Sequence, residues 1–72
     1  MKELFRRYVA IQYSGLYNMI TEAHEAMELA EIKFDDYYYI QEHYSELKEK
    51  YPRHFEYGKL LGDEMREKLH QN

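Results

Sequence analysis

The sequence predicts an all-α fold, a small bundle of three to four helices that could also dimerise. Apolar residues recur at helical spacing along most of the chain, and only one Pro and three Gly interrupt it. With 72 residues, the chain is expected to form a single helical domain, residues 1–72. A core of this size supplies only ~3–5 kcal/mol of stability, so a partner or a second copy would add to it.

Residues 2–14 are predicted to form the first helix. Gly15 ends it, because glycine readily adopts the left-handed conformation that closes a helix. A short connection follows over residues 16–20, and Asn18 or Thr21 could cap the next helix. The apolar face of the first helix consists of Leu4, Phe5, Tyr8, Val9, Ile11 and Tyr13.

Residues 21–32 are predicted to form a second helix with an apolar side and an acidic side. Leu29 falls in the middle of the acidic side, so an apolar side chain is expected to be exposed there. Residues 14–36 carry six acidic side chains and one basic side chain, so this part of the chain could meet a basic partner. The apolar side consists of Ile20, Ala23, Met27 and Ala30, and the acidic side of Glu22, Glu25 and Glu28.

Residues 36–51 are predicted to form the third helix and the centre of the domain. Asp35 or Asp36 would cap it, after a turn over residues 33–34. It should end just before Pro52, which disfavours a helical conformation in the preceding residue. Its apolar residues, with spacings of three, four, three and four, fall on one stripe: Tyr37, Ile40, Tyr44, Leu47 and Tyr51.

Residues 53–70 are predicted to form the fourth helix, with a break at Gly58 or Gly62 as the alternative. Two glycines four residues apart would let another backbone approach closely, and a second copy could supply it. The predicted oligomer seam consists of Phe55, Gly58, Gly62 and Met65. The core expected from all four helices consists of Phe5, Tyr8, Val9, Ile20, Ala23, Met27, Ile40, Tyr44, Leu47 and Leu61.

Composition disfavours several classes of protein. The absence of Cys excludes a disulfide scaffold and a thiolate metal site. No apolar run approaches the ~20 residues of a membrane span, and the first residues do not form a signal-peptide pattern. The formal net charge of −4 disfavours nucleic acid as a partner. We therefore expect a cytoplasmic protein that does not bind a membrane.

Tyrosine is the outlier, with nine residues of 72. Tyr37, Tyr38 and Tyr39 are consecutive, and successive helix positions differ by about 100°, so at least one ring must face solvent or a partner. Because aromatic residues anchor many protein interfaces, Tyr38 and Tyr39 are predicted to bind a partner. Leu29 would add an apolar contact, and the acidic residues that steer a basic partner would be Glu22, Glu25 and Glu28.

Two other kinds of binding protein remain open. A helix-turn-helix-like DNA-binding regulator fits the short turn between the second and third predicted helices. However, the carboxylates of Asp35, Asp36 and Glu42 would be repelled by DNA phosphates. In a nucleotide-sequestering sponge, tyrosines would stack on bases, and the phosphates would be bound by Arg6, Arg7 or Lys33.

The four His residues do not predict a metal site. His24 and Glu28 are one helical turn apart. Glu67 and His70 have the Glu-x-x-His spacing of di-iron bundles, but such a site needs two facing motifs. The two serines stand in no catalytic motif, and the chain contains no glycine-rich phosphate loop. We therefore expect no enzyme activity, no metal and no cofactor.

The pattern Tyr-x-x-x-Gln-x-Ser-Gly-x-x-Asn-Met occurs at residues 8–19. It resembles a pattern in short, uncharacterised helical proteins of Gram-positive phages and prophages, in which Glu31 would correspond to a Gly in a turn. The resemblance covers residues 4–51 and implies an accessory protein, without a known active site, in the bacterial host cytoplasm. The expected function is a non-catalytic interaction module that binds and inhibits or modulates a host protein such as a defence component. The matching residues are Tyr8, Gln12, Ser14, Gly15, Asn18 and Met19, with Ile40 and Tyr44 further along the chain.

Overall fold

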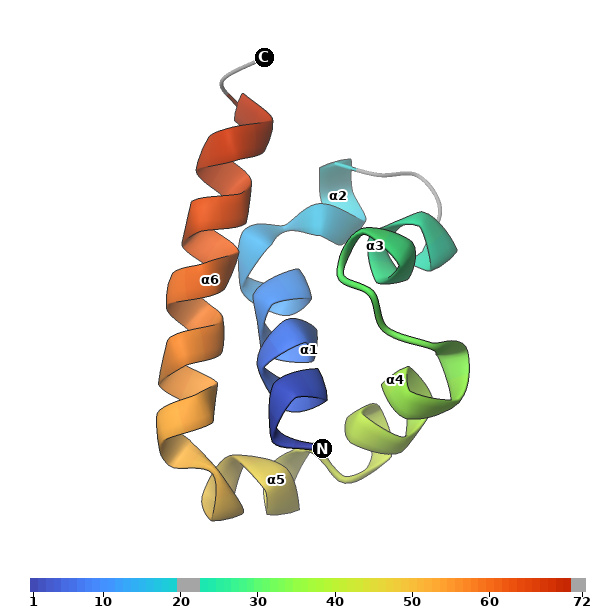
Figure 1. Ribbon diagram of the computed structural model, residues 1–72, viewed down its shortest axis with the longest axis vertical. Coiled ribbons are helices and arrows are strands. Elements are labelled where there is room, and N and C mark those ends of the chain that lie inside the picture. Colours follow the sequence, from blue (N-terminus) through green and yellow to red (C-terminus); the bar gives the residue numbers. More distant parts are fainter. Residues whose placement is uncertain (20–22, 71–72) are drawn as a thin grey trace.

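Helices account for nearly all of the chain that the computed structural model describes, residues 1–19 and 23–70. These two ranges contain no strand, so the predicted all-α fold is confirmed. The helices, in chain order (Figure 1), are α1 (Lys2–Ser14), α2 (Leu16–Met19), α3 (Ala23–Leu29), α4 (Phe34–Glu42), α5 (Tyr44–Lys50) and α6 (Pro52–His70).

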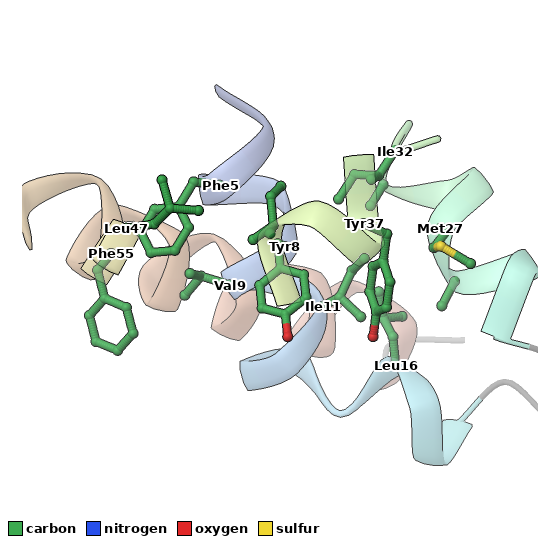
Figure 2. Close-up of a cluster of buried hydrophobic side chains, with 13 residues drawn as sticks. Phe5, Tyr8, Val9, Ile11, Leu16, Met27, Ile32, Tyr37, Leu47 and Phe55 are labelled. Carbon is green, nitrogen blue, oxygen red and sulfur yellow. The ribbon is translucent and has the colours of Figure 1, made fainter. Parts of the chain in front are cut away.

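The central helix is α1, not the predicted helix over residues 36–51. In Figure 1, α1 lies between α6 on one side and α3 and α4 on the other, and it packs against α6, α2 and α4. Residues 8–11 are four consecutive buried positions, which cover more than one side of a helix. Figure 2 shows that the core follows α1, and the side chains it labels are Phe5, Tyr8, Val9, Ile11, Leu16, Met27, Ile32, Tyr37, Leu47 and Phe55.

The helix α6 is continuous, as predicted, and packs along α1 through its two glycines. A Cβ atom on Gly58 would lie 2.6 Å from the Cβ atom of Val9, and one on Gly62 would lie 2.8 Å from the carbonyl oxygen of Ala10. The close backbone approach predicted at these glycines therefore takes place within one chain. In this structure α1 covers this face of α6, so the face is not open to a second copy. The predicted oligomer seam on this face consists of Phe55, Gly58, Gly62 and Met65.

The C-terminal end of α1 is closed by Gly15 and by Arg66 from α6. Gly15 has φ 74°, the left-handed conformation that the sequence predicted. Arg66 donates a hydrogen bond from Nε to the carbonyl oxygen of Ser14 at 3.1 Å. The buried hydroxyl of Ser14 donates to the carbonyl oxygen of Ile11 and accepts from the N–H of Leu16. A cation at the carbonyl end of a helix is favourable, so Arg66 fixes α6 along α1.

The predicted third helix is divided into α4 and α5, which meet at His43. His43 has φ −105° and ψ 23°, and its ring stacks on the ring of Tyr39 with centroids 4.2 Å apart. The apolar stripe nevertheless continues across the division, because Ile40 and Leu47 are buried and Tyr44 is half-buried. Because only His43 departs from the helical conformation, the three- and four-residue spacing of the apolar positions continues across it. The spacing in the sequence therefore does not reveal that the helix is divided.

The ends of these two helices agree only in part with the prediction. The N-cap of α4 is Lys33, so the predicted cap at Asp35 or Asp36 is wrong, and both carboxylates lie in the first turn instead. There they still face the positive end of the helix dipole. The end of α5 at Lys50 agrees with the prediction. Pro52 is the first residue of α6, a position at which its missing N–H has no helical partner to lose.

The predicted second helix is shorter in the structure, where α3 begins at Ala23. Residues 20–22, which include the predicted cap Thr21, lie outside the described part, and α2 is helical where a connection was expected. Glu31, after α3, has φ 57°, a left-handed conformation at the position where the phage-protein resemblance implies Gly. Arg7 donates from Nη1 to the carbonyl oxygen of Glu31 at 3.1 Å, and its Nη2 lies 3.7 Å from the Glu31 carboxylate.

The predicted core is correct at six of its ten positions. Ala23 is exposed, because α3 begins there and buries only Ala26 and Met27. Tyr44 and Leu61 are half-buried, and Ile20 lies outside the described residues. The six expected core residues that are buried are Phe5, Tyr8, Val9, Met27, Ile40 and Leu47.

Candidate interaction surface

Phe34 and Tyr38, one helical turn apart on α4, form an exposed aromatic pair. Their rings stack with centroids 6.3 Å apart and planes at 24°. The ring of Tyr37, which is buried, meets the ring of Tyr38 edge-on at 5.9 Å. Phe34 is 50% exposed and Tyr38 is 58% exposed, so solvent reaches both rings even though they pack against each other. A partner that covered such an ordered surface would immobilise few additional side-chain torsions.

The aromatic pair lies in the most acidic part of the chain. Residues 23–42 carry six acidic side chains and one basic side chain, a formal charge of −5. The rest of the chain carries eight acidic and nine basic side chains, a formal charge of +1. Asp35 and Asp36 follow Phe34 directly in the first turn of α4. The negative potential around the pair therefore favours a partner with a basic surface.

The predicted partner-binding residues are distributed over α3 and two sides of α4. Tyr38 belongs to the aromatic pair, whereas Tyr39 stacks on His43 and lines a separate shallow hollow with Glu46 and Lys50. Leu29 is 58% exposed on α3. The acidic residues of α3, Glu25 and Glu28, are exposed, and Glu22 lies outside the described residues.

The sequence does not reveal Phe34 as a binding residue, because residues 33–34 are predicted to form a turn. Its spacing of four from Tyr38 was a signal that the helix begins earlier. The sequence also does not reveal the outer face of α6, where Tyr57 is 51% exposed and Leu60 is 68% exposed. These two residues are three apart in a helix, and this is the same apolar spacing that identified the buried stripe of residues 37–51. Spacing alone therefore does not distinguish an exposed apolar face from a buried one.

A polar hollow beside α1 is lined by tyrosines and by Gln12. The amide Nε2 of Gln12 donates to the hydroxyl of Tyr37 at 3.4 Å, and Figure 2 shows the Tyr8 and Tyr37 hydroxyls on the same side of the core. Burial, with the nearby hydroxyls of Tyr37 and Tyr44, raises the pKa of Tyr8 to about 12. This hydroxyl therefore stays protonated at neutral pH and cannot serve as a general base there. The residues that line the hollow are Tyr8, Gln12, Tyr13 and Tyr44.

A basic hollow lies at the start of α6. The guanidinium of Arg6 lies over the ring of Tyr57, 4.9 Å from its centroid, and is 3.5 Å from the exposed carboxylate of Glu3. Its Nε is buried without a hydrogen-bond partner among the described residues. Desolvation, together with the charges of Arg6 and Lys2, lowers the pKa of His54, and the charge of Glu3 opposes this shift. The residues that line this hollow are Arg6, Arg53, His54 and Tyr57.

Residues 1–19 and 23–70 contain no group of three or more His, Asp or Glu side chains placed to hold a metal ion. None of the helices in these ranges is both long and apolar enough to cross a bilayer.

Comparison of the chain with protein-family models, with curated proteins and with solved structures gives no match. The resemblance at residues 8–19 therefore stays a prediction, and function is inferred from the surfaces described above.

Proposed function

We propose that this chain is a non-catalytic protein–protein interaction module that binds a basic protein surface through the aromatic pair of α4. The single observation that supports this most is the ordered, exposed stack of Phe34 on Tyr38 within the acidic segment of residues 23–42. The rings would enter an apolar depression on the partner and supply most of the binding energy, as aromatic anchors do. The carboxylates around them would accelerate association and select a basic partner.

The partner we propose is a host protein, in keeping with the resemblance to phage accessory proteins. Binding would inhibit or modulate that protein, which could be a defence or regulatory component. The module would act in the host cytoplasm by occupying a surface, because the described side chains offer binding groups rather than an acid–base or nucleophilic constellation.

The experiment is a capture from the lysate of a Gram-positive bacterium with the tagged chain, compared with two variants. Phe34→Ala/Tyr38→Ala removes the aromatic pair, and Leu60→Ala removes a more exposed apolar side chain on α6. We expect at least one protein to be captured by the wild type and by Leu60→Ala but not by the double variant. Its affinity, measured with the purified protein, should fall as salt is raised. Capture of the same proteins by all three forms would contradict the proposal.

A second candidate function is sequestration of a phosphate-bearing nucleotide, which the basic hollow favours. Of the three cations predicted to take phosphates, Arg7 is engaged with Glu31 and Lys33 lies in the acidic segment. Arg6 is also paired with a carboxylate, that of Glu3, but it lines a hollow together with Arg53 and His54. Tyr57 beside it offers a ring, although Arg6 already covers one face. A thermal-shift screen with cyclic dinucleotides and adenosine phosphates tests this function. A shift that disappears in Arg6→Gln would support it, and no shift at millimolar ligand would exclude it.

A further inference from the structure

The outer face of α6 carries a stripe of six residues that points away from α1. Gly58 and Gly62 fix the opposite face against α1, and Figure 1 shows α6 along one side of the molecule. Leu60 has the largest exposed fraction, 68%, among the exposed large apolar side chains of the described residues, and Tyr57 is 51% exposed beside it. The stripe consists of Arg53, Glu56, Tyr57, Leu60, Leu61 and Glu64.

The positions of the stripe have the same spacing in both directions along the helix. Its spacings are three, one, three, one and three, which are symmetric about the midpoint between Gly58 and Lys59. If two copies of α6 pair antiparallel about a two-fold axis at that midpoint, positions at equal distances from it face each other. Leu60 then faces Tyr57 of the partner subunit, and Arg53 faces Glu64 of the partner subunit. Two of the three kinds of facing pair therefore join apolar to apolar and basic to acidic side chains, and in the third pair Glu56 faces the half-buried Leu61 of the partner subunit at the edge of the stripe.

We propose that the chain forms an antiparallel two-fold homodimer through this stripe. Shape supports the same pairing, because Tyr57 and Leu60 form a ridge with a shallow hollow on each side. One hollow is lined by Pro52, Arg53, Glu56, Tyr57 and Leu60, and the other by Tyr57, Leu60, Leu61 and Glu64. The ridge of each copy fits beside the ridge of the other, and two Arg53–Glu64 pairs close the ends. This inference is independent of the proposed function, which uses α4.

The dimer should be weak and dependent on concentration. At about 1.5 Å of rise per residue, the stripe extends over roughly 16 Å of helix. A contact of that length buries less than the roughly 800 Å² per partner of a standard interface. The test is therefore sedimentation velocity over a range from about 10 µM to about 1 mM, with circular dichroism to confirm that each variant is folded.

We expect the average mass of the wild type to rise towards that of a dimer over this range. Leu60→Glu should abolish the rise, whereas Leu29→Glu, the same change at another exposed leucine, should not. Arg53→Glu should weaken dimerisation at least about tenfold, because two glutamates would then face each other. Arg53→Glu/Glu64→Arg should restore it, since the exchange recreates both ion pairs. A glutamate at residue 53 also suits the first turn of α6, so the variant should fold.

The orientation is tested by a spin label on Cys introduced in Lys68→Cys. In the antiparallel arrangement the two labelled positions are separated by about 28 Å along the helix axis, whereas parallel helices would bring them close together. The proposal is overturned if the wild type stays monomeric at the highest concentration. It is also overturned if Leu60→Glu dimerises like the wild type, if the double exchange does not restore association, or if the labels lie close together.

Discussion

The pair of helices α1 and α6 and the segment from α3 to α4 use apolar side chains in opposite ways. Between α1 and α6, two glycines bring the backbones close together, and Val9 and Ala10, which meet these glycines, are fully buried. On α3 and α4, by contrast, Leu29, Phe34, Tyr38 and Tyr39 are about half exposed or more. The first region therefore supplies most of the packing. The second region also buries core residues such as Met27 and Ile40, and it presents exposed rings together with carboxylates, which is why we propose that it binds the partner.

The largest effect on the free energy of unfolding is expected for Gly62→Ala, which overpacks the contact between α1 and α6. The new methyl group would lie 2.8 Å from the carbonyl oxygen of Ala10, which is backbone and cannot easily move. Overpacking of this kind should outweigh the gain of about 1 kcal/mol in helix propensity and leave a net loss of about 2 kcal/mol. Urea unfolding measures it, with Asp63→Ala on the adjacent exposed position as the control. A variant as stable as the wild type would contradict the close packing of α1 and α6.

Tyr8 connects the two regions, and its burial makes stability depend on pH. The pKa of Tyr8 is raised to about 12 in the folded chain, whereas an unfolded Tyr has a pKa of about 10. The buried, protonated Tyr8 hydroxyl contributes fully to the stability of the folded chain below pH ~10. This contribution is lost as pH rises towards ~12, because the unfolded chain then releases the Tyr8 proton more easily than the folded chain does. Tyr8→Phe should remove a loss of about 1.4 kcal/mol between pH 8 and pH 11. Urea unfolding at pH 8 and pH 11 measures it, and an unchanged dependence on pH would contradict the burial of this hydroxyl.

The sequence could predict the all-α fold, the bounds of α1 and the continuity of α6, because spacing, Gly15 and Pro52 each act locally. It could not identify α1 as the central helix, since that depends on which helices surround it. It does place Tyr8 and Tyr37 on apolar faces, where they are buried, and Tyr38 off the stripe, where it is exposed. Tyr13 differs, because it lies on the predicted apolar face of the first helix and yet is 39% exposed. The exposed anchor Phe34 was missed because the start of α4 is set by backbone geometry after Glu31.

A smaller effect of opposite sign is expected at the turn before α4, in Glu31→Gly. Glu31 has φ 57°, a conformation that is unfavourable for a residue with a Cβ atom. Glycine relieves this strain and keeps the backbone carbonyl that accepts from Arg7, although the exposed ion pair is lost. The net result should be a gain of about 0.5–1 kcal/mol, measured by urea unfolding. Glu28→Gly, in the helical part of α3, is the control and should lose stability. If Glu31→Gly also lost stability, the turn would not be strained.

The most direct test of the central claim is the free energy of unfolding of Phe34→Ala/Tyr38→Ala. If the aromatic pair serves binding rather than folding, the double variant should lie within about 0.5 kcal/mol of the wild type. The lost contact between the rings would be offset by the better helix propensity of Ala. A loss as large as the one expected for Gly62→Ala would contradict the account, because it would make the pair part of the core.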